Sequence, residues 1–382
     1  MPSPAEQDAF VAATRSLVAG EITPHAAAWE AAGEGAPDAL YRRFGELGYY
    51  GLLVPAEDGG SALDNVTYAR ITEELAAGDC AIANAVNVSN SPVAAAIRDH
   101  GTPAQCAHYL AALARGGQRG CFMLSEAEAG SDAAAVRTRA TQTARGWRLD
   151  GAKRFVTAGA RADFALVVAV TDPAAGKRGI STFLVPRDAW TVTRLEDKLG
   201  QRNCDTAECV FEGAEIGDEA LLGRPGDGYR IALAYLNTGR IGVAAQAVGV
   251  ARAAFEAAAA YARERRTFGV PIVEHQAVGF RLAEMAERLT AARALTLHAA
   301  ALADAGQPAI VEASLAKAHA TDMAEQVTSA ALQVFGGAGY TRDYPVEKLY
   351  RDARVLSIYE GSNDIQRLVV ARAIAGGWSA LP

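Results

Sequence analysis

The sequence has few cysteines, and none of them has the spacing of a metal or redox site. Five cysteines are scattered along the chain, with no CxxC pair. An odd, scattered set predicts free thiols in a reducing compartment rather than a disulfide framework. The six histidines show no metal-ligand spacing and no HExxH motif, so we expect no metal. The reducing compartment indicated by the cysteines favours a cytoplasmic location, and the expected location is the bacterial cytoplasm.

Long apolar runs and an excess of positive charge are also lacking. No apolar stretch reaches about 18 residues, and the N-terminus has no basic segment followed by an apolar run, so neither a membrane span nor a signal peptide is expected. The net charge of −7 argues against a nucleic-acid partner. Half of the 382 residues are hydrophobic, which is enough for two or three packed units.

The hydrophobic pattern changes twice along the chain. Residues 1–118 have apolar positions at helical spacing, separated by segments rich in Gly and Pro. Residues 119–225 contain short β-rich runs, such as 164–170 and 180–185, that predict an antiparallel barrel or sandwich. Residues 226–382 return to helical periodicity over long segments joined by short loops, which favours an antiparallel bundle. The expected fold class is therefore α+β, in the order helical, β and helical.

A glycine-rich run, Gly336-Gly337-Ala338-Gly339, follows the long helix predicted over 309–335. A dinucleotide-binding fingerprint would instead follow a strand and open a helix. Glycine commonly ends a helix, so we interpret the run as a helix end and not as part of a Rossmann fold. Its backbone still remains open to a ligand.

One carboxylate near the C-terminus lies in an otherwise uncharged stretch. Glu360 is placed between Tyr359 and Gly361. Apolar neighbours raise the pKa of a carboxyl, as a base at neutral pH requires, and a glycine lets a ligand approach the backbone. Ser362 suits the N-cap and Asp364 the first turn of a terminal helix. The alternative, and the commoner case, is a solvated Glu in the loop before that helix.

Two other segments are candidates for ligand binding. Small and polar residues at 125–132 follow an apolar run, as in a loop that binds a polar cofactor edge or in an ordinary turn. Arg265 ends a long predicted helix, where it complements the helix dipole. Arg240 begins the same helix, where a positive charge is unfavourable, and this points to a specific role such as binding an anion.

Several motifs, in this order and spread over nearly the whole chain, resemble the acyl-CoA dehydrogenase family of flavoproteins. They are LSEAEAGSD (124–132), KRFVTAG (153–159), YARERRTFG (261–269), EHQ (274–276), QVFGGAGY (333–340), YPVEKLYRD (344–352) and IYEGSNDIQ (358–366). The resemblance implies an N-terminal all-α domain (1–118), a middle β-domain (119–225) and a C-terminal four-helix bundle (226–382). It also implies non-covalently bound FAD and a homotetramer built as a dimer of dimers.

The resemblance gives Glu360 the role of catalytic base. This residue would remove the α-proton of an acyl-CoA thioester while the β-hydride passes to flavin N5, and an electron-transferring flavoprotein would accept the electrons. The backbone N–H of Glu360 and a ribityl hydroxyl of FAD would hold the thioester oxygen. The substrate-binding residues implied are Ser131, Asn237, Arg240, Tyr359 and Gly361. The cofactor-binding residues implied are Phe122, Leu124, Ser125, Ser131, Phe155, Thr157, Arg265, Thr267, Phe268, His275, Gln276, Gln333, Gly336, Gly337, Ser362 and Asp364.

This chain departs from the common family pattern at some of these positions. Ser125 replaces the usual Thr and Phe155 a common Trp, which keeps a hydroxyl and an aromatic ring. Asn237 replaces a frequent acidic residue. Gly239 has no carboxylate, whereas branched-chain and long-chain relatives place their base on that helix. The base of this chain is therefore Glu360 or absent.

The acyl group and the reaction leave alternatives open. Residues 86–91 resemble short-chain members, which favours a short or medium acyl group. Their polar side chains also suit a functionalised acyl group, or one tethered to a carrier protein. The rival functions are a flavin monooxygenase or oxidase of the same fold and an acyl-CoA-binding protein without turnover. The Tyr-Glu-Gly motif counts against the first rival, and the intact base and cofactor positions count against the second.

Overall fold

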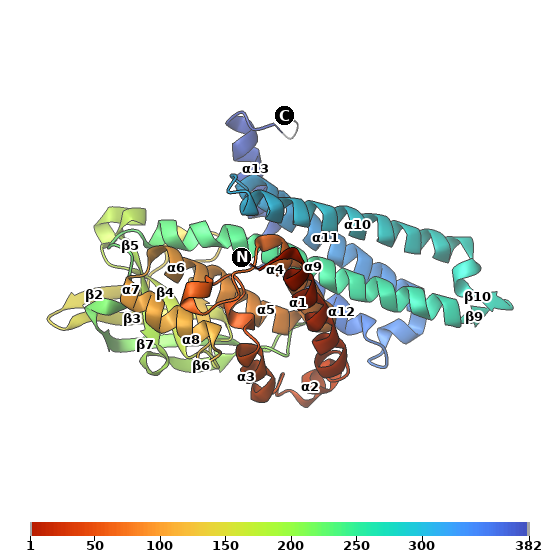
Figure 1. Cartoon of the computed structure of the whole chain (residues 1–382), viewed down its shortest axis with the longest axis horizontal. Helices are drawn as coiled ribbons and strands as arrows, with labels where there is room; N and C mark the ends of the chain where they lie inside the picture. Colours follow the sequence, from red (N-terminus) through yellow and green to blue (C-terminus); the bar gives the residue numbers. More distant parts are fainter. Residues whose placement is uncertain (1, 380–382) are drawn as a thin grey trace.

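The computed structural model describes residues 2–379, apart from the side chain of Asn237, and has the expected order of helical, β and helical regions (Figure 1). Asp64 and Asp79 cap two successive N-terminal helices through their carboxylates. The N-terminal helices are α1 (Pro4–Leu17), α2 (Ala26–Ala32), α3 (Asp38–Glu46), α4 (Asn65–Gly78), α5 (Cys80–Val88), α6 (Ala95–His100), α7 (Pro103–Gln105) and α8 (Ala111–Ala114).

The middle region is one sheet with the order β6-β7-β3-β2-β4-β5-β8, in which β1 pairs with β4. Most pairings are antiparallel as expected, but β1 and β2 each pair with β4 in parallel. The strand β4 reads FALVVAV and is buried along most of its length, which explains its continuous apolar run. The strands are β1 (Gly120–Met123), β2 (Arg139–Thr143), β3 (Gly146–Thr157), β4 (Phe164–Val170), β5 (Ile180–Pro186), β6 (Thr191–Leu195), β7 (Thr206–Ile216) and β8 (Leu221–Leu222).

The C-terminal region is built around α9, which packs against α4, α5, α10 and α11 (Figure 1). Buried alanines along α9 allow these close approaches. A short hairpin, β9 and β10, follows α9 at the end of the molecule far from the sheet (Figure 1). The elements are α9 (Gly228–Glu264), β9 (Arg266–Thr267), β10 (Val270–Pro271), α10 (Gln276–Asp304), α11 (Ile310–Phe335), α12 (Val346–Ala353) and α13 (Asn363–Ala375).

One expectation about α9 is wrong. The helix begins at Gly228 and not at Arg240, which therefore lies about three turns inside it. The dipole at the helix N-terminus falls off within the first turn, so it does not act on Arg240. The reason for an arginine at this position is its buried neighbours, described below.

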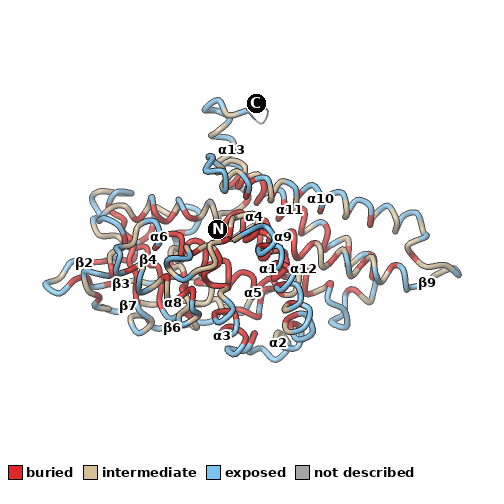
Figure 2. The backbone as a smooth tube through the Cα atoms, in the orientation of Figure 1, coloured by how far each residue is buried: buried red, intermediate tan, exposed pale blue. Residues whose placement is uncertain are grey.

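Burial separates the interior from two exposed extensions (Figure 2). Among the described helices, α9 alone is long and apolar enough to cross a membrane by length and composition, but 72% of its apolar stretch is buried inside the protein. Such burial is typical of a core helix. In contrast, α13 and the β9–β10 hairpin are largely exposed (Figure 2). All five cysteines are free, as expected.

Candidate active site

The Tyr-Glu-Gly motif forms a tight turn between the 3-10 segment Arg354–Ser357 and α13. Glu360 and Gly361 both have positive φ angles, of 53° and 81°. A positive φ is uncommon for a residue with a side chain and often occurs at functional sites. Ser362 caps α13 as predicted, because its Oγ accepts a hydrogen bond from the backbone N–H of Ile365.

The turn directs the Glu360 carboxylate onto the backbone of α9. A β-carbon at position 239 would lie only 3.0 Å from Glu360 Oε2, so Gly239 leaves the space that the carboxylate fills. Oε2 is buried and has no hydrogen-bond partner within the described part of the chain. A buried, unpaired carboxylate oxygen is costly and is typical of a group kept for chemistry.

Burial and two cations set the charge state of this carboxyl. Burial raises the pKa of Glu360 to about 7, although the nearby Arg240 and Lys317 oppose this rise. Arg240 is itself buried, donates from Nη1 to Ser314 Oγ at 3.1 Å, and has a pKa lowered by burial. A carboxyl with a pKa close to neutral is suited to general-base catalysis.

Lys317 is a site residue that sequence reasoning missed. Its side chain is fully buried on α11, and Nζ donates to Gly361 O and to Asn363 Oδ1, each at 3.0 Å. Burial lowers the pKa of Lys317 to about 7. The lysine thus fixes Gly361 and Asn363, which follow Glu360 in the chain. Its sequence signal is a lysine on the apolar stripe of α11, between the buried Ala313 and Ala320.

Tyr359 is fixed by side chains from α9 and from the loop after β6. Its hydroxyl donates to Gln246 Oε1 at 2.5 Å and accepts from Gln201 Nε2 at 3.3 Å. The backbone N–H of Gln201 also bonds to Asp352, close to the end of α12. The residue before Glu360 is therefore tied to three separate parts of the fold.

The structure brings several of the predicted flavin-lining residues together beside the C-terminal end of β3. Lys153 Nζ donates to Leu124 O at 3.0 Å, and the Arg154 N–H donates to Ser125 O at 2.9 Å. A register shift in β3 gives Phe155 a φ of 57° and leaves its ring 58% exposed. An apolar ring turned outward by an irregular strand is typical of a binding surface.

Lys153 is a second functional candidate that was missed from the sequence. Its side chain has no exposed surface and also forms an ion pair with Glu126 at 2.7 Å. Burial lowers the pKa of Lys153 to about 8, against the opposing effect of Glu126. This pair positions the 124–126 loop beside β3. The signal in the sequence is a lysine inside a strand that is otherwise half buried.

The other predicted residues of the sheet side are more dispersed. Phe122 and Leu124 pack against a buried cluster that includes Ala232 of α9. Thr157 is half-buried at the end of β3, and Ser131 is exposed in the turn that follows the 124–126 loop. Asp364 is exposed in the first turn of α13 and pairs with Arg367.

A second group of predicted cofactor residues lies at the opposite end of the bundle (Figure 1). Thr267 Oγ1 and His275 Nε2 are 2.8 Å apart across the β9–β10 hairpin, and Phe268 is 97% exposed. Stacking of Tyr261 on Phe335 at 4.1 Å places the end of α11 beside the end of α9. This second group consists of Arg265, Thr267, Phe268, His275, Gln276, Gln333, Gly336 and Gly337. Within one copy of the chain, this second group lies far from Glu360, because Gly239 lies in the N-terminal half of α9 and Arg265 follows its C-terminal end.

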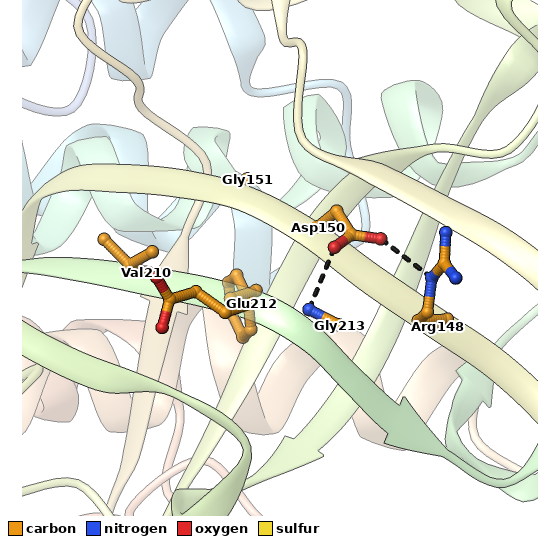
Figure 3. Close-up of a pocket in the computed structure, with 7 residues that line it drawn as sticks. Arg148, Asp150, Gly151, Val210, Glu212 and Gly213 are labelled. Atoms are coloured by element: carbon orange, nitrogen blue, oxygen red, sulfur yellow. Dashed lines mark hydrogen bonds and ion pairs between the residues drawn. The ribbon is translucent and has the colours of Figure 1, made fainter.

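A hollow of about 650 Å³ lies elsewhere, on the surface of the paired strands β3 and β7 (Figure 3). Asp150 accepts hydrogen bonds there from the Gly213 N–H and from Arg148 Nε. None of the predicted site residues lines this hollow. Asp150 and Phe155 are five residues apart on β3, or about 16 Å along an extended strand.

Comparisons with known proteins match this arrangement over the whole chain. Family models for the acyl-CoA dehydrogenase N-terminal, middle and C-terminal domains match residues 4–117, 121–214 and 226–375. An acyl-CoA dehydrogenase of Bacillus subtilis is 42% identical and covers 95% of this chain and 96% of the relative. The mitochondrial short-chain specific acyl-CoA dehydrogenase of Bos taurus is also 42% identical, over 88% and 82% of the two chains. The chain belongs to the acyl-CoA dehydrogenase family.

Solved structures of the acyl-CoA dehydrogenase family superpose closely on this one. Butyryl-CoA dehydrogenase from Megasphaera elsdenii has a TM-score of 0.95 at 36% identity, covering 98% of this chain and 99% of that one. A chain from a structure entitled electron transferring flavoprotein of Acidaminococcus fermentans, a study of flavin-based electron bifurcation, has the same TM-score and coverage at 38% identity. The curated relatives are acyl-CoA dehydrogenases, so the protein is an oxidoreductase.

Members of this family are FAD-binding flavoproteins, and the residues of this chain suit such a cofactor. Phe155 offers an exposed flat ring beside the Leu124–Ser125 backbone. At the other end, a β-carbon placed on Gly336 or Gly337 would meet no atom within 4 Å, so the backbone there is open to a ligand. Arg265, which follows α9 at the same end of the bundle, adds an exposed positive charge, as a diphosphate requires.

Proposed function

We propose that this protein catalyses the FAD-dependent α,β-dehydrogenation of a short- or medium-chain acyl-CoA to the trans-2-enoyl-CoA. The observation that carries this proposal is the Glu360 carboxyl, which is buried against Gly239, has a pKa of about 7 and lacks a hydrogen-bond partner in the described residues. Such a group is primed to take a proton from a substrate that excludes water.

Each residue of the turn has a role in this proposal. Glu360 removes the pro-R α-proton, and its backbone N–H would hold the thioester oxygen together with a hydroxyl that a bound FAD would supply. When bound, FAD supplies the hydride acceptor at N5. Gly361 allows close approach of the thioester, and Lys317 and Arg240 keep part of the Glu360 population ionised at neutral pH. Ser131, Asn237 and Arg240 are proposed to contact the CoA side.

The residues beyond Gly239 on α9 support a short acyl group. Gln246 lies on the same helix face, about 10 Å further along the axis, and its bond to Tyr359 fixes its side chain there. Asn87 lies between them, against Gly242. These side chains leave little length for an alkyl chain, in line with the butyryl-CoA and short-chain neighbours.

The proposed assembly is a dimer of dimers in the bacterial cytoplasm, with domain boundaries near residues 118 and 225. Support comes from the two groups of cofactor residues, which lie at opposite ends of one chain, and from the exposed Phe268. A second copy would bring its hairpin to the first copy's flavin. The electron-transferring flavoprotein is proposed as the acceptor, in line with the similar chain in the Acidaminococcus structure.

Anaerobic titration of the yellow holoprotein tests the proposed reaction. We expect butyryl-CoA or hexanoyl-CoA to bleach the flavin rapidly, with octanoyl-CoA and isobutyryl-CoA slower. The absorbance is followed by stopped flow as each thioester is added. No bleaching with any of them, together with rapid oxygen uptake after chemical reduction, would indicate the monooxygenase or oxidase instead. No bleaching and no oxygen uptake would indicate an acyl-CoA-binding protein without turnover.

The pH dependence of this reduction reports on Glu360. The second-order rate constant should rise with pH and level off above about 7, because only the ionised carboxylate is a base and its pKa is about 7. Lys317→Met removes a positive charge that lowers the pKa of Glu360, so the inflection should move to higher pH. Stopped-flow reduction at subsaturating thioester, from pH 5.5 to 9, measures the shift.

Lys317→Arg is the matched variant, because it keeps the charge and changes the geometry of the contacts with Gly361 and Asn363. A purely structural role for Lys317 would lower the rate in both variants at every pH. If the inflection of Lys317→Met stays where it is in the parent protein, Lys317 does not set the pKa of Glu360.

A further inference from the structure

Two buried amide side chains near Glu360 have donors that the protein does not use. Asn87 on α5 is fully buried, and its Oδ1 accepts from the Tyr68 hydroxyl at 2.5 Å, while Nδ2 has no acceptor within the described residues. Gln246 on α9 is also fully buried, and its Nε2 likewise lacks an acceptor there. Buried donors are nearly always paired, so each unpaired donor needs an explanation.

Both amides lie at the face of α9 that the Glu360 carboxylate contacts. Gly239, Gly242 and Gln246 are three and four residues apart and so share one face of α9. Glu360 fills the space beside Gly239, and Asn87 fills the space beside Gly242, where a β-carbon would lie 1.9 Å from Asn87 Oδ1. The helix rise places Asn87 about 4.5 Å from Glu360 along the axis.

This spacing defines a position on the acyl group. The α-carbon must lie against the Glu360 carboxylate for proton removal. An atom attached to the γ-carbon is three bonds of about 1.5 Å further along and so reaches the level of Asn87. The Tyr68 hydroxyl donates to Oδ1 and thereby holds the amide with its NH₂ group unused. Nδ2 therefore keeps an unused donor at this level of α9.

We propose that the preferred acyl group carries a neutral hydrogen-bond acceptor, a hydroxyl or carbonyl oxygen, on its γ-carbon, and that Asn87 binds it. This inference rests on the proposed function of Glu360. The acceptor is neutral because the side chains that surround the position, Tyr68, Asn87, Gln246 and Tyr359, are uncharged. A carboxylate would need a cation, and the two nearby cations have other partners, since Arg240 donates to Ser314 and Lys317 donates to Gly361.

Two thioesters of equal size test the proposal. 4-Hydroxybutyryl-CoA and pentanoyl-CoA have the same number of heavy atoms and differ by a hydroxyl in place of a methyl group. We expect the second-order rate constant for flavin reduction to be at least about tenfold higher for the hydroxy compound in the holoenzyme, because a site built to bind a hydroxyl discriminates strongly against its absence. In Asn87→Leu the ratio should fall to about one or below.

Matched serine variants separate substrate binding from folding. Asn90 lies three residues further on and is also buried, but its Nδ2 donates to Tyr49 O at 2.7 Å and to Val86 O at 2.9 Å. Asn90→Ser should therefore lower stability and leave the hydroxy-to-methyl ratio as in the parent. Asn87→Ser replaces the amide by a smaller polar side chain. It should reduce the ratio even if Asn87→Leu does not fold.

The outcomes distinguish this inference from the function on which it rests. If butyryl-, pentanoyl- and 4-hydroxybutyryl-CoA all fail to bleach the flavin, the dehydrogenase reaction is wrong and the inference falls with it. If pentanoyl-CoA reduces the flavin as well as 4-hydroxybutyryl-CoA does, and Asn87→Ser leaves the ratio unchanged, the γ-acceptor is overturned while the dehydrogenase stands.

Discussion

Glu360→Gln is expected to retain FAD and to lose thioester-dependent flavin reduction by about 10²–10⁴-fold. The amide has nearly the shape of the carboxyl, so it fills the space beside Gly239, but it cannot accept the α-proton. General-base catalysis contributes about 10²–10⁴ in rate, and removing a group that acts only in the transition state lowers kcat and kcat/KM together. Anaerobic stopped-flow bleaching by the best thioester measures the loss.

Glu325→Gln is the control for charge. Glu325 accepts a hydrogen bond from Ser357 Oγ, just before the catalytic turn, and its side chain is partly exposed. Its substitution changes the net charge by the same amount, and we expect reduction within about twofold of the parent. Near-normal reduction in Glu360→Gln would mean that another group removes the proton.

Thermal stability gives an independent measure of the same carboxyl. The folded pKa of Glu360, about 7, lies above its unfolded value of 4.5. Ionisation therefore opposes folding, and this cost grows as pH rises from 4.5 through 7. Glu360→Gln should melt at a higher temperature than the parent at pH 8, and this difference should be much smaller at pH 5. If Glu360→Gln melts at the same temperature as the parent at pH 8, or at a lower one, burial of the ionised Glu360 does not destabilise the fold.

Local features of the sequence predicted local structure well. Ser362 caps α13, the Gly336 run ends α11, and the Tyr-Glu-Gly stretch forms a turn before α13, because each feature depends on neighbours within a few residues. The position of Arg240 was misjudged for the same reason. The residues next to it in the chain do not show that about three helical turns precede it. The charge that its guanidinium interacts with is that of Glu360, 120 residues away in the sequence.

Distant partners explain why Lys317 and Lys153 were missed and why Asn87 was noted only as part of the range 86–91. Lys317 meets the catalytic turn, Lys153 meets the 124–126 loop, and Asn87 meets α9 only after the chain has folded. Each is a polar residue at an apolar position of a helix or strand. Such a position marks a residue that needs a tertiary partner, but it does not identify the partner.

Lys348→Met is expected to lower the free energy of unfolding by about 3–5 kcal/mol, the usual effect of breaking a buried ion pair on one side. Lys348 Nζ lies 2.8 Å from Asp79 Oδ2 and 2.5 Å from Asp352 Oδ2, and all three side chains are buried. Although burial opposes it, the two aspartates raise the pKa of Lys348. Removing the lysine leaves two buried carboxylates without a counter-charge. Urea unfolding of the holoprotein measures the loss, with the exposed Lys177→Met as control.

The pH dependence of this loss distinguishes charge from packing. Burial raises the pKa of Asp352, and Lys348 opposes that rise, so the variant should have a still higher folded pKa. A carboxyl whose folded pKa exceeds its unfolded value destabilises the fold as pH rises. The free energy of unfolding of Lys348→Met should therefore be lower at pH 8 than at pH 6. Adding Asp352→Asn should restore part of the stability. A loss that is equal at both pH values and unaffected by Asp352→Asn would indicate lost packing alone.

The same network extends from stability to the catalytic turn. Asp79 caps α5 at the N-terminal end of the segment that carries Asn87, and Asp352 accepts from the backbone of Gln201, which in turn bonds Tyr359. Loss of Lys348 should therefore loosen the residue before Glu360 as well as the helix that bears Asn87. We expect slower flavin reduction in Lys348→Met even where the variant is fully folded. Near-parental reduction at low temperature would mean that the turn is held by Lys317 and Gln246 alone.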